Sequence, residues 1–469
     1  MKSPPTFTQG LVYAPATVDD PQLLLSARKA RDIVELAGVL LLYCRGHEAQ
    51  YREASNSYAN RIGEAALREA AADLFRAIGS EALEAAETGA VDRLLSEPSL
   101  PLVVRARAVA VGLDSALGSR FQGVFRSKGK VRLQAAAPIP VARPPLRELL
   151  ERVNSLPERL DERVDRLPRL RLAPGDLRPF AVDLDFSSAD QLAPLISEKS
   201  QTFATCHPNR THDEYVPVVP CLTAEDRFFW FSPEDVGRQR RILRCLLEQA
   251  ASGEATIVVL PELCLDAETA QEILADFRGL RSKVRLFLAG SHHVEVGGFR
   301  RNQALALLRG RKEPLHYWKS APFVARYGMN RPLQEDIHLE AEPLITAYFS
   351  GDWSFSILIC KDFLDARMRN LLTDLGVNLL LLPAMTPVTD AFEAFAQPLT
   401  QTNQAWVVMA NTPAQPSNLH AVFGGPLRGR FNATVNAVGT RGRRGAPGVC
   451  FYRVRDGHVL WVDAERIFD

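Results

Sequence analysis

One stretch constrains the fold of this 469-residue chain more than any other: residues 354–372, SFSILICKDFLDARMRNLL. Residues 354–359 are apolar apart from two serines, which is typical of a strand buried on both faces. The apolar spacing after Cys360 then changes to that of a helix. Cys360 is therefore predicted at the carboxyl end of a buried strand, where helix N-terminal amides favour a thiolate. The alternative is that Cys360 is only a small buried side chain.

Buried strands alternate with amphipathic helices from residue 178 onward, which predicts a layered α/β domain. A helix over 231–251 is predicted with Ser232 as N-cap and Pro233 in its first position. The predicted strands are 178–186, 255–266, 284–293, 377–387 and 405–413. Further helices are predicted over 267–280 and 389–404. Hairpins are predicted over 302–323, with Gly310 in the turn, and over 448–465.

The first part of the chain has a different character. Residues 20–120 are rich in Ala, Leu, Glu and Arg at helical spacing, which predicts helices without a fixed-period repeat. Residues 123–134 suggest a hairpin or a basic loop, and 146–172 suggest two short amphipathic helices. We expect three parts: a helical domain of unknown role (1–137), a proline-rich and amphipathic linker (138–177) and the α/β domain (178–469).

Composition excludes some classes of protein. The 56 basic and 55 acidic residues give a net charge of +1, so global charge indicates no polyanionic partner. Basic residues at 126–132 and 441–445 leave nucleic-acid binding as a weaker alternative. Seven scattered cysteines without a CxxC pair fit a reducing compartment, and the N-terminus lacks the pattern of a secretory signal. We expect a cytoplasmic protein that neither enters a membrane nor binds nucleic acid.

Two charged residues accompany Cys360. Glu262 follows a six-residue apolar strand and Pro261, where a carboxylate serves either as an N-cap or as a catalytic base. Lys319 lies in the apolar and aromatic segment PLHYWKSAPF, where the alternative is a surface lysine with a buried stem. Neither residue is diagnostic by itself.

The ordered set PEL, YWKSAPF and ICKD, each at the end of a predicted strand, resembles the nitrilase or carbon–nitrogen hydrolase superfamily. Gly290-Ser291, Asn302 and Asp362 stand where that family has similar residues, as do LGVNLLLLPA at 375–384 and VVMAN at 407–411. The resemblance covers roughly residues 178–455. It implies a nitrilase-like αββα sandwich, with two mixed sheets between helix layers, preceded here by an all-α domain.

The resemblance also implies a Glu-Lys-Cys triad at Glu262, Lys319 and Cys360. Cys360 would attack the carbon and form a thioester, Glu262 would act as acid and base, and Lys319 would stabilise the oxyanion beside the Lys361 N–H. Many family members carry a second glutamate that positions the lysine. Glu335 and Glu340 both qualify by place, and we favour Glu335. The mechanism requires no cofactor.

Substrate-binding residues are harder to assign from sequence. We assign Lys361, Asn302 and His292 to substrate binding. Lys361 directly follows Cys360, and Asn302 stands where the family has a similar residue. His292 and His293 follow a predicted strand and Gly290-Ser291, where they either reach the rim of the pocket or are core or surface histidines. Lys361 stands where the family commonly has an aromatic residue. It either lowers the pKa of the neighbouring Cys360, binds an acidic substrate or points to the helix surface. Ser356 replaces a glycine usual in the family.

In the segment CHPNRTH at 206–212, Cys206, His207 and His212 have metal-capable side chains, as does the later Cys221, but their spacing matches no zinc pattern. We interpret it as a loop insertion over the active site, with a structural zinc as the alternative, and we assign no metal-binding residue.

We therefore predict a hydrolase of a non-peptide carbon–nitrogen bond, with an amide favoured over a nitrile. The family resemblance implies a homodimer through the nitrilase-like domain. The alternative is a regulatory or effector protein whose helical domain binds a partner protein, and whose C-terminal domain is activated on assembly or is non-catalytic.

Overall fold

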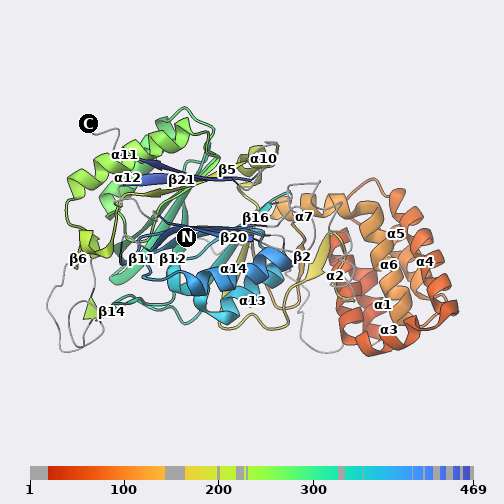
Figure 1. The fold of residues 1–469 in the computed structure, drawn as a ribbon. Helices are drawn as coiled ribbons and strands as arrows, with labels where there is room; N and C mark the ends of the chain where they lie inside the picture. Colours follow the sequence, from red (N-terminus) through yellow and green to blue (C-terminus); the bar gives the residue numbers. More distant parts are fainter. Residues whose placement is uncertain are drawn as a thin grey trace. The chain divides into compact units, whose positions relative to one another are not determined.

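The computed structural model describes residues 20–142, 164–197, 201–217, 227–228, 231–325, 333–351, 353–403, 405–415, 418–425, 434–439, 447–454 and 458–464. It divides into two compact units (Figure 1). The helical unit comprises Met1–Arg178 and Val182–Ser187, and the sandwich unit comprises Pro179–Ala181 and Ser188–Asp469. In the described ranges, no helix has both the length and the apolar character needed to cross a bilayer.

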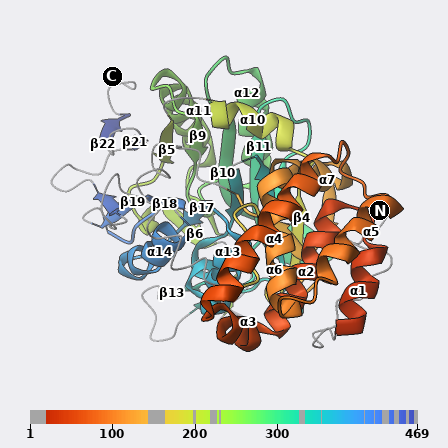
Figure 2. The same ribbon diagram turned by 90° about the vertical axis from the view of Figure 1, so that its right-hand side faces the viewer.

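The helical unit contains the helices expected from the sequence. They are α1 (Asp20–Lys29), α2 (Ile33–Gly46), α3 (Glu48–Ser55), α4 (Tyr58–Arg76), α5 (Ala85–Leu95) and α6 (Leu102–Leu117). Helix α6 packs between α2 and α4, and Figure 2 shows α4 and α6 side by side. A Cβ on Gly112 of α6 would lie 2.7 Å from the Cβ of Ala71 on α4, so the close approach of these helices requires glycine.

The basic segment after α6 is not the hairpin or loop expected from the sequence. Residues Phe121–Lys128 form helix α7, and only Lys130–Arg132 form a strand, β1, which pairs with β4 (Ala181–Asp185). Three of its basic side chains are paired: Lys128 lies 3.6 Å from Asp32, and Lys130 and Arg132 lie 2.8 and 2.5 Å from Asp183. These ion pairs reduce the positive charge available to a polyanion.

Part of the expected linker lies inside the helical unit. Strand β2 (Pro138–Pro140) pairs with β3 (Leu170–Leu172), and all three residues of each strand are buried. The amphipathic helices expected over 146–172 fall mainly outside the described residues, and β3 occupies the end of that range.

The sandwich unit contains two mixed sheets. In one, the order is β12 (Leu315–Trp318), β11 (Phe299–Leu308), β10 (Leu286–Val296), β9 (Ile257–Val259), β5 (Thr202–His207), β21 (Gly448–Arg453) and β22 (His458–Asp463). In the other, the sandwich unit contributes β15 (Leu344–Ser350), β16 (Trp353–Ile357), β17 (Leu379–Ala384), β18 (Trp406–Asn411), β19 (Leu419–Gly425) and β20 (Thr434–Gly439). Each sheet has three parallel strands at its centre, β10, β9 and β5 or β16, β17 and β18.

Helices cover the outer faces of both sheets. Helices α11 (Val236–Ser252) and α12 (Ala267–Gly279) pack on the first sheet, and α14 (Asp390–Thr402) packs on the second, with α13 (Ala366–Leu375) beside it (Figure 1). Strands β9 and β10 contact β17, and β5 and β9 contact β18, so the two sheets lie face to face. The expected αββα sandwich is confirmed.

The start of α11 differs from the sequence prediction. Ser232 and Pro233 belong to a short strand, β8 (Phe231–Pro233), and Asp235 caps the helix by accepting from the Arg238 N–H at 2.8 Å. The apolar pattern of α11 predicted the helix correctly, but Asp235 competes with Ser232 for the same capping role.

Candidate active site

Glu262 follows β9 in a tight turn at the carboxyl end of the central strands. Its side chain is 1% exposed, and its N–H donates to Ala384 O, at the end of β17, at 3.3 Å. The next residue, Leu263, has a left-handed backbone with φ 55°. Neighbouring Gly290 has φ +66°, and a Cβ there would lie 2.1 Å from Pro261 O. Only glycine therefore allows β10 to approach this turn.

Lys319, directly after β12, joins two carboxylates in the buried interior. Its Nζ lies 2.6 Å from Glu262 Oε1 and 2.7 Å from Glu335 Oε2. Asn302 donates its amide to Oε1 of each carboxylate, at 3.0 Å to Glu262 and 2.8 Å to Glu335. Burial lowers the Lys319 pKa, but the charges of Glu262 and Glu335 outweigh it, so the pKa is raised and the amine stays charged.

Glu335, on β14 (Leu333–Glu335), is the second carboxylate beside Lys319. Burial raises its pKa, but the charge of Lys319 and the hydrogen bond from His293 outweigh burial and lower it. His293 Nε2 donates to Oε1 at 2.9 Å, and the Phe323 N–H donates to Oε2 at 2.7 Å. Glu335 is thus held ionised by four donors, counting Lys319 and Asn302.

Cys360 lies where β16 gives way to a short 3₁₀ helix, η3 (Cys360–Leu364). Its φ is 44°, a left-handed backbone conformation that costs a non-glycine residue energy; residues strained in this way cluster at functional sites. The thiol is 3% exposed. Burial and the charge of Glu262 raise its pKa well above the ordinary value, although Lys319 and the Met385 N–H act in the opposite direction. The resting thiol is therefore protonated at neutral pH.

Glu262 is arranged to accept a proton from that thiol. Its Oε1 is occupied by Lys319 and Asn302, whereas its Oε2 has no hydrogen-bond partner among the described residues. The Cys360 thiol lies against this carboxylate and interacts with it. Burial is the largest effect on Glu262 and raises its pKa, despite the opposing charge of Lys319. A raised pKa makes Glu262 a stronger base once it is ionised.

Asp362 fixes the segment that follows Lys319. Its carboxylate accepts from the Ser320 N–H at 3.1 Å, the Ser320 hydroxyl at 2.9 Å, the Ala321 N–H at 2.7 Å and the Tyr317 hydroxyl at 2.9 Å. Burial raises the pKa of Asp362 to about 6, against the charge of Lys319 and these hydrogen bonds. The residue two positions after the cysteine therefore ties the cysteine turn to the lysine loop.

A second loop, residues 384–386, approaches the thiol through the Met385 N–H. Asn411, at the end of β18, binds the backbone of Thr386 in this loop through both polar atoms of its side chain. Its Oδ1 accepts from the Thr386 N–H at 2.8 Å, and its Nδ2 donates to Thr386 O at 3.1 Å. Thr412 N also donates to Ala384 O at 3.1 Å.

The segment CHPNRTH is not a loop throughout, because Cys206 and His207 belong to strand β5. Two of its histidines contact backbone oxygens at the end of β18. His207 Nδ1 lies 3.3 Å from Asn411 O, and His212 Nε2 lies 2.8 Å from Thr412 O. Burial lowers the pKa of both histidines, so each is neutral at pH 7. No group of three metal-capable side chains occurs in the described ranges, and Cys221 lies outside them.

The structure brings together Glu262, Lys319, Cys360, Glu335 and Asn302, all of which were assigned from the sequence. Asn302 was assigned to substrate binding, but its amide donates to the two carboxylates. The alternative Glu340 is half-exposed and pairs with Arg301, away from Lys319. Glu335 is therefore the glutamate beside the lysine.

Two assigned substrate-binding residues lie outside this cluster. Lys361 is exposed, and its Nζ donates to Pro322 O at 3.1 Å. His292 pairs with Gln303 on β11, whereas His293 pairs with Asn302. Because side chains alternate along a strand, His292 lies on the opposite face from the cluster. Its burial lowers its pKa to about 4.

Two residues that were noted in the sequence without a committed role contribute to the cluster. The structure shows that His293, rather than His292, reaches Glu335, and that Asn411 fixes the loop beside the thiol. His293 pairs with Asn302 across β10 and β11, so the two side chains lie on the same face of the sheet. To choose His293 over His292 from the sequence, one would need to know the register of this antiparallel pair. The asparagine of VVMAN was recognised only as part of a resemblance.

No family model and no curated protein matches this chain in sequence. Solved structures of nitrilase superfamily members are similar to part of it. An amidase of that superfamily from Nesterenkonia has 16% identity and a TM-score of 0.37, covering 55% of this chain and 91% of its own. Saccharomyces cerevisiae Nit3 has 13% identity and a TM-score of 0.38, covering 57% and 92%. The C. elegans NitFhit protein has 16% identity and a TM-score of 0.39, covering 54% and 60%.

Proposed function

We propose that the sandwich unit hydrolyses the carbon–nitrogen bond of a small amide through a thioester on Cys360. The observation that carries this proposal is the contact of one carboxylate, Glu262, with both the Lys319 ammonium and the Cys360 thiol. A base, a cation and a nucleophile in contact are the groups that acyl transfer needs.

In the first half-reaction, Glu262 takes the proton from the Cys360 thiol while Sγ bonds to the amide carbon. The raised pKa of the thiol makes this base necessary, because the resting enzyme contains little thiolate. The carbon–nitrogen bond then breaks, and the leaving amine takes the proton from Glu262. The products are a thioester on Cys360, the free amine and an ionised Glu262.

Negative charge develops on the substrate oxygen during this attack. Lys319 supplies a fixed positive charge, and the Lys361 N–H lies in the first turn of η3, where an N–H has no intrahelical acceptor. Glu335, His293 and Asn302 hold the ammonium in place, so little reorganisation accompanies the reaction.

In the second half-reaction, water replaces the amine. Glu262 takes a proton from water as the oxygen bonds to the thioester carbon, and the carbon–sulfur bond then breaks. The thiolate regains the proton from Glu262, which restores the starting state and releases a carboxylic acid. The balance is amide plus water giving acid plus amine, with no oxidant or cofactor.

The experiment is a panel of primary amides and matched nitriles, assayed for ammonia release, with intact-mass measurement during turnover. We expect release from at least one amide, together with a mass increase equal to its acyl group. Glu262→Gln should prevent both. Turnover that continues in Cys360→Ala, or an acyl group attached elsewhere, would contradict the proposal. A fully inactive panel together with an unreactive Cys360 would favour the non-catalytic alternative.

A further inference from the structure

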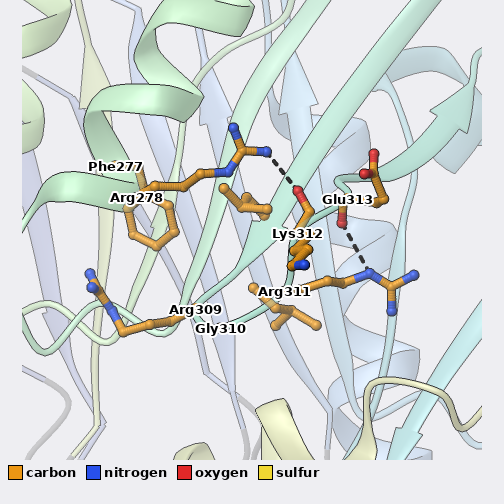
Figure 3. A pocket seen from close by; sticks show the side chains of 9 residues that line it. Phe277, Arg278, Arg309, Gly310, Arg311, Lys312 and Glu313 are labelled. Atoms are coloured by element: carbon orange, nitrogen blue, oxygen red, sulfur yellow. Dashed lines mark hydrogen bonds between the residues drawn. The ribbon is translucent and has the colours of Figure 1, made fainter.

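A cavity of about 550 Å³ lies at the far end of the first sheet from the catalytic cluster. It is formed by the end of α12 and the β11–β12 turn, and Figure 3 shows its lining side chains. Leu308, at its edge, lies six residues beyond Asn302 on β11, which is about 20 Å at the rise of an antiparallel strand. A ligand here would therefore not touch Cys360.

The cavity wall is strongly basic. Four of its residues are cationic, Arg278, Arg309, Arg311 and Lys312, whereas Glu313 is the one acidic residue among those lining it. Both Arg278 and Lys312 are exposed, and the Arg278 guanidinium donates a hydrogen bond to a backbone oxygen rather than to a carboxylate. Cations gathered without counter-charges raise the local concentration of anions.

Backbone oxygens hold several of these cations in position. Arg278 donates to Lys312 O at 2.7 Å, and Arg311 donates through Nε to Glu313 O at 3.0 Å; the dashed lines in Figure 3 mark both bonds. The bond to Lys312 O uses only part of the Arg278 guanidinium, which carries five N–H donors, whereas Arg311 also donates to Ser188 Oγ. A site whose cations are already fixed loses less conformational entropy when it binds.

Arg309 has a structural role instead. It donates to Val284 O at 2.7 Å, Leu280 O at 2.8 Å and Ser282 Oγ at 3.0 Å, and its guanidinium lies 4.9 Å from the centre of the Phe277 ring. Phe277 is buried, so its ring cannot stack on a base or an aromatic ligand. The accessible groups are charges, which selects a compact polyanion over an aromatic ligand.

We propose that this basic cavity binds a small multivalent oxyanion, one that carries several phosphate or carboxylate groups. Arginine forks suit both chemistries, since each group offers two oxygens in a plane to paired N–H donors. The site is separate from the amide-hydrolysing cluster, and the proposal does not depend on that function.

The test is isothermal titration calorimetry of the full chain with tripolyphosphate, with citrate as the carboxylate arm, at physiological ionic strength. We expect saturable binding with one site per chain, and tighter binding of one anion identifies the chemistry of the natural ligand. The double variant Arg278→Ala/Lys312→Ala should bind about tenfold more weakly or worse.

The matched control is Arg241→Ala/Arg367→Ala, which removes the same charge from exposed positions away from the cavity. It should bind like the unmodified chain. Absence of saturable binding of both anions would overturn the proposal, and so would equal weakening in the two double variants. Thermal melting of each variant verifies that it is folded.

Discussion

The backbone N–H of Lys319 donates to the carbonyl oxygen of Asn302 at 2.9 Å, and the side chains of these two residues bind the same oxygen of Glu262. The pairing of β11 with β12 thus positions the Asn302 amide and the Lys319 ammonium together. The other oxygen of Glu262 remains for the thiol.

Cys360 should be the reactive thiol. We expect iodoacetamide to add one group that is absent in Cys360→Ala, because Glu262 can deprotonate this thiol when the reagent enters. The control is Cys245→Ala, which removes a half-buried cysteine outside the cluster. Peptide mapping by mass spectrometry locates the label. Labelling that persists in Cys360→Ala and vanishes in Cys245→Ala would refute the assignment.

Lys319→Met should abolish turnover and also destabilise the fold, by about 3–5 kcal/mol, because it leaves two buried carboxylates without their cation. The double variant Lys319→Met/Glu335→Gln removes one carboxylate as well and should regain part of that stability. It should remain inactive, since the oxyanion still lacks a cation. Denaturant unfolding and ammonia release measure the two effects separately; recovery of turnover in the double variant would exclude a catalytic role for Lys319.

His293 should matter to turnover and His292 should not, although the two are adjacent. His293→Gln weakens the hydrogen bond to Glu335 Oε1, so kcat should fall roughly tenfold while KM changes little. His292→Gln lies on the other face of β10 and should keep kcat within about twofold. Steady-state kinetics on both variants tests this, and equal effects would contradict the register argument.

Asn411 should act by positioning the loop beside the thiol. Asn411→Ala removes two hydrogen bonds to Thr386, which frees the Met385 N–H to move away from Sγ. We expect kcat to fall and the pH at which Cys360 is alkylated to shift upward. Asn378→Ala is the matched control, since Asn378 is also buried but accepts from Ser354 N at the opposite end of β17. A shift of the alkylation profile in both variants would indicate a general loss of packing instead.

Asp362 predicts a specific dependence of stability on pH. Its pKa is raised from 3.8 to about 6 in the folded state, so the native protein binds more protons than the unfolded chain between these values. Its contribution to the free energy of unfolding therefore decreases as the pH rises from about 4 to about 6, by up to about 3 kcal/mol, and is constant above that. The stability difference between the unmodified protein and Asp362→Asn should narrow over this range. Urea unfolding at several pH values measures it; a difference that widens with pH would reverse the assignment.

Much of the fold was predictable because its signals are local. Apolar runs of five or six residues between helical segments identified the central strands around Glu262 and Cys360. The wrong predictions lie where local preferences compete. Asp235, not Ser232, is the N-cap of α11. The basic segment predicted as a hairpin or loop forms helix α7, because Phe121, Val124 and Phe125 are buried on one face of it.

By itself, the sequence predicted Glu262, Lys319 and Cys360 as the reacting groups and placed each of them at the end of a strand, since residue type and apolar periodicity are properties of the chain. Tertiary structure decided which of these residues meet. The register of β10, β11 and β12 selects His293 over His292, and β14 brings Glu335 rather than Glu340 to Lys319. Such choices depend on contacts between residues far apart in sequence, and a shift of one residue in a strand would send each side chain to the opposite face.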